Sequence, residues 1–326
     1  MKRSHWLPWV GWLQVLILAA ALAGCQDSKP QMLRVGGTIW PGYEGIYLAN
    51  HLGYYQGLPI RVIEYPSASA AIRDFQEGLL EAIPLTMDET LLQSGGGVPF
   101  KVVMVFDVSH GGDVIIARKG IRRFSQLKGK KIALESNALG AYMLSRALEI
   151  NRLGPSDIIP VNRDLNEQEN ALIQGEVDAV VTFGPVSAKL LAKGYSKVFD
   201  SRQIPGEIVD VLLVRTDYLE RNPKMVASLI SGYFKALDMQ SNQFTIAAEF
   251  SARREGVTME EFQQGLEGIH ILTPQENLRW FGEEREDFLR RTEKLAQVMA
   301  KNKLLQQKVD GASLLDGKIL GMVNVP

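Results

Sequence analysis

The sequence predicts an α/β fold in which two similar lobes each contain a mostly parallel sheet flanked by helices. Short apolar, β-branched runs alternate along the chain with segments of helical period, which is typical of strand–helix–strand units. One pattern of glycine, acidic and apolar residues occurs twice at a fixed offset. A helical stretch with no evident strands follows the second copy, so it must pack on a lobe that is already formed.

The first residues predict a secretory signal peptide that ends at a lipid attachment site. Lys2 and Arg3 precede an apolar run over residues 13–23, the arrangement expected of a signal peptide. The run is shorter than the ~20 residues that a membrane-spanning helix needs. Leu22-Ala23-Gly24-Cys25 resembles the lipobox of bacterial lipoproteins. A signal anchor with an incidental cysteine is the alternative.

The resemblance implies cleavage after residue 24 and lipidation of Cys25, with residues 25–31 as a polar tether. Two acyl chains suffice for stable anchoring to a membrane. We therefore expect the mature protein in the periplasm or at the cell surface. Gln26 follows the cysteine, where an aspartate would favour the inner membrane in enteric bacteria, so we expect the outer membrane.

Composition limits the class of protein. About 300 residues remain after the signal, which is more than one core usually holds. Loss of Lys2 and Arg3 changes the formal net charge from −1 to −3, and such a chain has no electrostatic basis for binding nucleic acid. Cys25 is the only cysteine and the four histidines are scattered. We expect no metal site and no cofactor.

The strands are expected in a regular order, with helices between them. Their ranges are 33–37, 60–65, 82–86, 101–106, 130–134, 179–183, 195–200 and 209–215.

An internal repeat predicts that the two lobes arose by duplication. Gly78-Leu-Leu-Glu-Ala-Ile recurs 97 residues later as Gly175-Glu-Val-Asp-Ala-Val, and Gly97 corresponds to Gly194 at the same offset. Each copy follows a predicted helix and precedes a predicted strand. Convergence is the alternative, because glycine commonly ends helices that lead into apolar strands.

The C-terminal third predicts helices that begin at recognisable capping residues. Asn222-Pro223 places a cap before a proline at the first turn. Thr258 with Glu261, and Thr273-Pro274 with Glu276, fit capping boxes. We expect a long polar helix to continue to about residue 309.

Three stretches resemble the solute-binding proteins of ABC importers. They are WPGYEGIYLANHLGYYQ, LKGKKIALESNALGAYML and FDSRQIPGEIVDVLLVR. The nearest branch is that of the nitrate, sulfonate, taurine and thiamine-pyrimidine precursor binders, which includes the yeast pyrimidine synthases. The resemblance implies a type II-like periplasmic binding protein, monomeric, that closes on a small ligand by hinge motion and delivers it to permease and ATPase subunits.

The resemblance also implies the limits of the lobes. The first lobe would comprise residues 32–114 and 208–326, with the C-terminal helices packed on it, and the second lobe residues 115–207. The hinges would lie near 113–118 and 206–212.

Candidate ligand-binding residues follow the predicted strands, because ligands of open α/β sheets bind beyond the carboxyl ends of the strands. The candidates are Trp40, Tyr43, Asp88, Asp107, His110, Asp113, Glu135, Asn137, Phe183, Glu207 and Asp210. Asp88, Asp107 and Glu135 are the foremost carboxylates. Trp40 and Tyr43 offer aromatic faces for a planar group, although Trp40 could belong to the core and His110 to solvent.

Charge favours a ligand that donates hydrogen bonds from nitrogen. Helix N-termini near residues 42–45 and 137–141 would suit an anion such as nitrate or a sulfonate. However, six of the candidates and Glu89 are carboxylates, and the same loops carry no lysine or arginine. Such a cluster would repel an anion at close range. We expect an amine, amidine or aminopyrimidine, unless these acids cap helices or face solvent.

An enzyme and a receptor for a membrane sensor are the two alternatives to an import function. Enzymatic relatives use a cysteine-rich motif and a histidine, whereas the mature chain has no thiol besides Cys25. The sequence also contains no His-Glu-x-x-His motif and no Gly-x-Ser-x-Gly elbow. A receptor that presents its ligand to a membrane sensor would have the same fold and pocket, so that alternative stays open.

Overall fold

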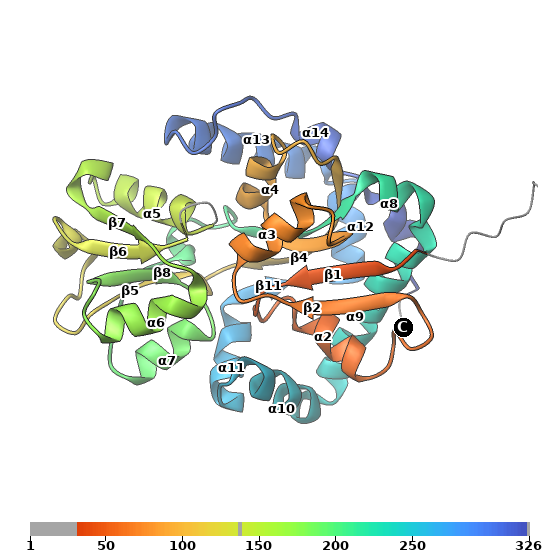
Figure 1. The fold of residues 1–326 in the computed structure, drawn as a ribbon, viewed down its shortest axis with the longest axis horizontal. Helices are drawn as coiled ribbons and strands as arrows, with labels where there is room; N and C mark the ends of the chain where they lie inside the picture. Colours follow the sequence, from red (N-terminus) through yellow and green to blue (C-terminus); the bar gives the residue numbers. More distant parts are fainter. Residues whose placement is uncertain (1–30, 136–138, 325–326) are drawn as a thin grey trace, which may run out of the picture. The chain divides into compact units, whose positions relative to one another are not determined.

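The strands after the predicted tether pair into two separate sheets (Figure 1). The structure is a computed structural model that describes residues 31–135 and 139–324. The predicted signal, Cys25 and Asn137 lie outside the described residues. Residues 32–326 form one compact unit that contains both sheets.

The first sheet has six strands in the order β11-β4-β10-β3-β1-β2. Their bounds are β1 (Leu33–Gly37), β2 (Ile60–Glu64), β3 (Ala82–Thr86), β4 (Phe100–Ser109), β10 (Val209–Arg215) and β11 (Ile269–Ile271). β1 runs parallel to β2 and β3, whereas β10 is antiparallel to both β3 and β4. β11 is antiparallel to β4.

The second sheet has five strands in the order β7-β6-β8-β5-β9. Their bounds are β5 (Val114–Ala117), β6 (Lys131–Leu134), β7 (Ile159–Asn162), β8 (Ala179–Thr182) and β9 (Ser196–Asp200). β6 runs parallel to β7 and β8, and β5 is antiparallel to β8 and β9. The expected α/β fold of two similar sheets is confirmed. β1 to β4 share one direction in the first sheet and β6 to β9 share one in the second, while the remaining strands run oppositely and make both sheets mixed.

The mixed pairing arises because the two sheets exchange one strand each. After β4 the chain crosses into the second sheet, where β5 inserts between β8 and β9. After β9 it returns, and β10 inserts between β3 and β4. Without the exchanged strands the sheets follow the same plan, which supports duplication. The crossings lie between Ser109 and Val114 and between Asp200 and Val209. The division into a first lobe of residues 32–114 and 208–326 and a second lobe of residues 115–207 remains a prediction.

The repeated glycines occupy equivalent turns between a helix and a strand. Gly78 lies between α3 (Ala68–Gln76) and β3 with φ of +77°, and Gly175 lies between α6 (Leu165–Ile173) and β8 with φ of +74°. A side chain disfavours this left-handed conformation, so both turns require glycine. The repeat in the sequence therefore reflects a repeated turn geometry.

Helices flank both sheets. The remaining ones before the second crossing are α2 (Glu44–His51), α4 (Met87–Gln93), α5 (Leu139–Ile150) and α7 (Val186–Ala192). Those after it are α8 (Thr216–Arg221), α9 (Pro223–Asn242), α10 (Phe244–Glu255), α11 (Met259–Glu267), α12 (Pro274–Phe281), α13 (Arg285–Lys301) and α14 (Gly311–Leu314). Within the described residues, no helix is both long enough and apolar enough to cross a membrane.

The C-terminal helices pack on elements of the first sheet, as expected: α9 on α2, α13 on α4 and α14 on β4. The predicted capping boxes at Thr258 and Thr273 are present. Two expectations are corrected. This stretch does contribute a strand, β11, and α13 ends at Lys301, well before residue 309. Lys303 has a φ of +61°, a left-handed conformation that ends helices.

An aromatic cluster fixes the start of α2 against the first sheet. The ring of Phe106 on β4 lies 5.1 Å from the ring of Tyr43 and 5.1 Å from that of Tyr233 on α9, both edge-on. The Tyr233 hydroxyl also donates to the carbonyl oxygen of Gly42 at 3.0 Å. Tyr43 is therefore held rigidly at the carboxyl end of β1.

Candidate ligand-binding cavity

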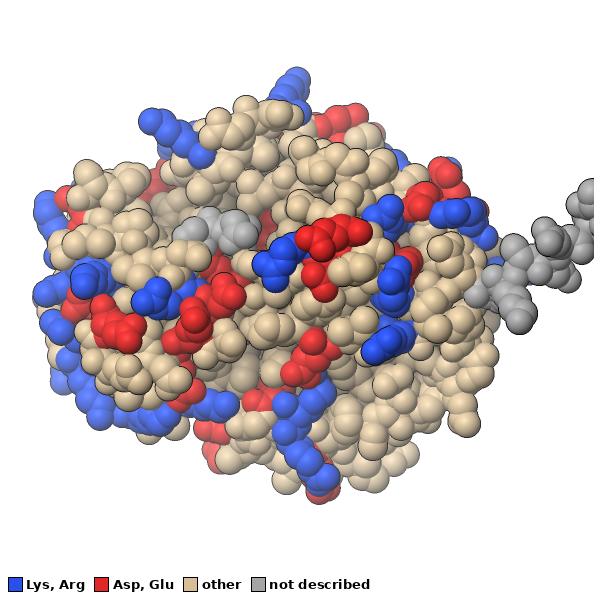
Figure 2. All heavy atoms as spheres, viewed as in Figure 1, with Lys and Arg blue, Asp and Glu red and all other residues tan. Residues whose placement is uncertain are grey.

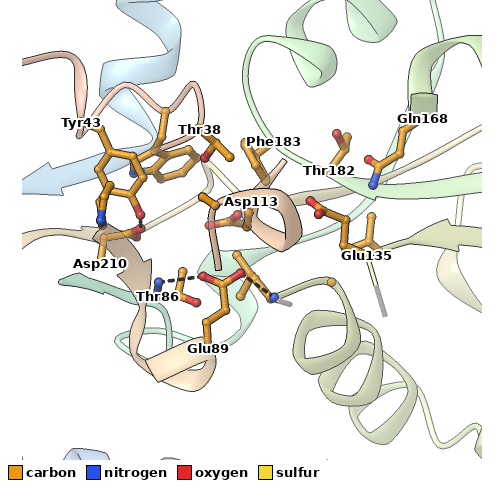
Figure 3. Close-up of a pocket in the computed structure, with 17 residues that line it drawn as sticks. Thr38, Tyr43, Thr86, Glu89, Asp113, Glu135, Gln168, Thr182, Phe183 and Asp210 are labelled. Carbon is orange, nitrogen blue, oxygen red and sulfur yellow. Dashed lines mark hydrogen bonds between the residues drawn. The ribbon is translucent and has the colours of Figure 1, made fainter. Parts of the chain in front are cut away.

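A narrow cavity of about 40 Å³ lies where residues of the two sheets meet (Figure 3). Its lining from the first sheet and its helices consists of Thr38, Trp40, Tyr43, Ala68, Ala71, Pro84, Thr86, Glu89 and Asp210. The first crossing contributes Asp113, and the second sheet and its helices contribute Glu135, Leu139, Gly140, Gln168, Val181, Thr182 and Phe183. Six of the predicted candidates thus meet in one cavity.

Asp210 and Asp107 form a pair of buried carboxyls on neighbouring strands. They lie directly opposite each other in the β10–β4 register. The Tyr43 hydroxyl donates to Oδ1 of Asp210, and Trp40 Nε1 donates to Oδ2 of Asp107 at 3.0 Å. Burial raises the pKa of Asp107 to about 8 and that of Asp210 well above its usual value. Two like charges at this separation require a proton or a cation between them.

Glu89 closes one of the two helix N-termini that by themselves would suit an anion. Its Oε1 accepts from the backbone N–H of Leu139 at 3.1 Å, at the start of α5, and its Oε2 accepts from Thr86 N–H at 3.0 Å. A helix N-terminus attracts anions, and here the chain supplies that anion itself. Burial raises the pKa of Glu89.

Asp113 and Glu135 complete the set of acids in the lining. Burial raises the pKa of each carboxyl to about 7. Glu135 follows β6 and accepts from Ser69 Oγ on α3 at 2.9 Å, so it joins the second sheet to a helix of the first. Among the described residues that line the cavity there is no lysine, arginine or histidine to balance these carboxyls.

Trp40 and Phe183 form an aromatic corner of the cavity. Their ring centroids lie 5.5 Å apart and the rings are nearly perpendicular, at 89°. Trp40 belongs to the first-sheet core, with 4% of its surface exposed, and it also lines the cavity. The core and pocket interpretations of Trp40 therefore both apply.

Four predicted candidates do not line the cavity. Asp88 neighbours Glu89 on α4, so its side chain leaves the helix in another direction; it is buried, and burial raises its pKa to about 8. Asp107 is not in the lining, but it accepts from Trp40 and lies opposite Asp210, which both line the cavity. His110 is exposed in the crossing loop. Glu207 is held by Arg146 Nε at 2.7 Å and the Tyr142 hydroxyl at 2.6 Å.

The case of Glu207 shows a limit of the charge argument. Its own loop carries no base, as the sequence indicates, but Arg146 reaches it from α5, 61 residues away in the chain.

The predicted candidates omit Glu89, Thr86, Gln168 and Thr182, which line the cavity. Thr86 and Thr182 end strands β3 and β8, a position that could have identified them. Gln168 lies inside α6, where the sequence gives no signal.

The surface charge agrees with the cavity. On the face drawn in Figure 2, acidic side chains lie along the boundary between the regions of the two sheets, and many basic side chains lie at the outer edge of the second. Such a distribution attracts cations toward the boundary. Within the described chain, no group of three or more His, Cys, Asp or Glu residues could hold a metal ion.

Comparison with known proteins identifies similar chains. The family model described as NMT1/THI5 like matches residues 40–243. A putative aliphatic sulfonates-binding protein of Escherichia coli K12 is 26% identical over 235 residues, which are 68% of this chain and 70% of that protein.

Solved structures show the same fold. The alkanesulfonate-binding protein SsuA of Xanthomonas axonopodis pv. citri, bound to MOPS, superposes with a TM-score of 0.74 at 18% identity, covering 89% of this chain and 99% of that one. The desulfurization enzyme DszB superposes with a TM-score of 0.65 at 16% identity, covering 89% and 98%. The fold is therefore shared by binding proteins and by an enzyme.

Proposed function

The chain belongs to the NMT1/THI5-like family, and on that premise we propose that it is the solute-binding component of an ABC-type importer. It captures a small solute between the two sheets by hinge closure and delivers it to a membrane permease with its ATPase. The cavity between the sheets and the two crossings support this role. Because residues of both sheets line the cavity, movement of one sheet relative to the other would admit the solute and enclose it.

The solute is a nitrogen compound that carries positive charge or donates N–H bonds. One observation carries this part of the proposal: four buried carboxyls, Glu89, Asp113, Glu135 and Asp210, line the cavity without a basic residue among the described lining. The α5 N-terminus, which could attract a sulfonate, is already occupied by Glu89. An amine, amidine or aminopyrimidine fits this surface, whereas a sulfonate would be repelled.

The protein is located outside the inner membrane and is anchored to the outer membrane through a lipid on Cys25. It is a monomer. The lipobox motif supports the tether. We infer that it performs no catalysis, because the described lining of the cavity holds no cysteine or histidine of the kind that the enzymatic relatives use. Recovery of the bound solute unchanged after prolonged incubation would test that part.

Isothermal titration of the full-length protein in detergent tests the proposed solute. Acetamidine, methylamine and 4-aminopyrimidine are titrated in parallel with nitrate and ethanesulfonate. We expect saturable binding of at least one nitrogen compound. At a hundred times its Kd that compound should add ~2.7 kcal/mol to the free energy of unfolding. Tight binding of nitrate or ethanesulfonate with no response to the nitrogen compounds would overturn the proposal.

A further inference from the structure

Several buried acceptor atoms in the cavity lack a hydrogen-bond donor. Among the described residues, Thr86 Oγ1 has no partner, and neither do four atoms of more deeply buried residues: Asp113 Oδ2, Asp210 Oδ2, Gln168 Oε1 and Thr182 Oγ1. Each of these four residues lines the cavity and is 1–2% exposed. Buried polar atoms in folded proteins are nearly always paired, so these four indicate where donors of a ligand would be received.

The four atoms are distributed around the cavity and not gathered on one side. Asp210 lies on β10 of the first sheet, and Asp113 lies in the crossing. Gln168 on α6 and Thr182 at the end of β8 belong to the second sheet. In Figure 3, Gln168, Thr182 and Glu135 lie together on one side, the Tyr43–Asp210 pair lies on the other, and Asp113 lies between them.

Most N–H donors of the lining side chains are already used within the protein. Trp40 Nε1 donates to Asp107, and Gln168 Nε2 donates to the carbonyl oxygen of Arg163 at 3.3 Å. The hydroxyl of Tyr43 donates to Asp210. With their carboxyls ionised, the described lining side chains therefore offer the ligand mainly acceptors, apart from the threonine hydroxyls and the second N–H of Gln168 Nε2.

We propose that the solute is a small planar cation with N–H donors on two or more sides, of the amidinium or guanidinium class. This inference rests on the proposed function and narrows its solute. A primary ammonium carries its three donors on one atom and reaches one side of the cavity. A quaternary ammonium carries none and would leave every acceptor unpaired. A planar cation directs its donors outward in a fork, and its face can lie against Trp40.

Calorimetric titration of the full-length protein in detergent at pH 7.5 distinguishes these classes. The probes are acetamidine, methylguanidine, methylamine, tetramethylammonium and ethanesulfonate at equal ionic strength. We expect acetamidine or methylguanidine to bind at least tenfold more tightly than methylamine, with no heat from tetramethylammonium.

Each other outcome overturns the inference. If methylamine binds as tightly as acetamidine and methylguanidine, or more tightly, the solute does not need donors on two sides. That result leaves the proposed function in place. Tighter binding of tetramethylammonium than of the other cations would indicate recognition by aromatic faces instead of by hydrogen-bond acceptors. Binding of ethanesulfonate alone overturns the inference and the proposed nitrogen solute but is consistent with import. An absence of binding by every cation overturns the inference.

A Thr182→Val variant tests the second-sheet side of the cavity with little change of shape. Its hydroxyl has no partner among the described residues, so its loss should leave the Tm of the empty protein unchanged or higher. We expect the preference for methylguanidine over methylamine to shrink at least threefold. Thr245→Val, at an exposed position of α10, is the matched control. An unchanged preference in Thr182→Val would contradict the inference.

Discussion

Buried carboxylates in two regions of this protein have opposite electrostatic surroundings. Glu44, at the start of α2, is fully buried and accepts a hydrogen bond from Arg254 Nε at 2.9 Å. Asp200 is buried and accepts from Lys197 at 3.0 Å and from Arg202. In the cavity, Asp113 and Asp210 are equally buried but have no base beside them among the described lining.

The pKa values of Asp200 and Asp113 differ in the direction that these surroundings predict. Burial raises the pKa of Asp200, but hydrogen bonds from Arg202 and Lys197 outweigh it and bring the pKa below its usual value. Burial without such a partner raises the pKa of Asp113 to about 7. Desolvation of an ion is costly unless a counter-ion offsets it. The chain thus supplies counter-ions for Glu44 and Asp200 and none, among the described lining, for Asp113 and Asp210.

The largest expected effect comes from removing a structural counter-ion. Arg254 binds Glu44, reaches Glu64 and lies 3.7 Å from the ring centre of Tyr47. Arg254→Met leaves Glu44 buried without a partner, so we expect the free energy of unfolding to fall by about 3–5 kcal/mol. Urea denaturation measures this change.

The neighbouring arginine provides the control. Arg253 pairs with Glu249 at the surface, with 78% of its side chain exposed, and Arg253→Met should change stability by less than about 0.5 kcal/mol. Adding Glu44→Gln to Arg254→Met should restore part of the loss. If Arg254→Met lowered the free energy of unfolding by less than about 1 kcal/mol, Glu44 would not depend on its counter-ion, and the contrast with the cavity carboxyls would be lost.

The next effect is on binding. Asp113→Asn removes one charge from the cavity, and a charge-assisted hydrogen bond is worth about 1.5–3 kcal/mol. We expect the affinity for acetamidine to fall roughly 10-fold to 150-fold, while the free energy of unfolding of the empty protein stays equal or rises. Titration and urea denaturation measure the two quantities.

Asp238→Asn, on the exposed side of α9, is the control for this charge removal. It should leave both quantities unchanged. If Asp113→Asn destabilised the empty protein and left the affinity intact, Asp113 would be a structural acid like Asp200.

A separate effect is expected from pH. The raised pKa values, about 7 for Asp113 and Glu135 and about 8 for Asp107, lie above those of the unfolded chain, near 4. The folded protein therefore holds more protons between about pH 4 and 8, and its stability falls as pH rises through this window. We expect the Tm of the empty protein to be lower at pH 8.5 than at 5.5 by at least about 2–4 °C.

A cationic ligand acts in the opposite direction, because it favours the ionised carboxylates. The Tm increase given by acetamidine should therefore grow from pH 5.5 to 8.5. A stability that rises with pH in the empty protein would show that the cavity carboxyls are compensated after all.

The smallest effect is expected at His110. The side chain is exposed in the first crossing and does not line the cavity. His110→Ala should change the affinity for acetamidine less than twofold, as titration would show. A larger loss would extend the binding surface into the crossing loop.

Local patterns predict the strands of this fold well, and they predict the cavity only in part. VDVLLVR coincides with β10 because a buried strand needs a continuous apolar run, and the repeated glycines identify equivalent turns. β11 has three residues and forms by pairing with β4, which no local pattern reveals. Asp88 and Glu89 are adjacent acids, and only the direction of α4 determines that Glu89 lines the cavity.

The compensation of charge is likewise a tertiary property. The loop sequence around Glu207 contains no base, yet Arg146 approaches it from α5. The loops around Asp113 and Asp210 contain none either, and no base approaches them from elsewhere among the described lining. Sequence reasoning treats these acids alike, and the packing of the helices separates them.

The central claim is that the buried carboxyls of the cavity receive a cation. Titration of acetamidine at pH 7.5, in two buffers of different ionisation enthalpy, tests it directly because it counts protons exchanged on binding. The account predicts saturable binding with release of protons, since a cation lowers the raised pKa values of these carboxyls. Saturable binding of ethanesulfonate with uptake of protons, and no binding of acetamidine, would contradict it.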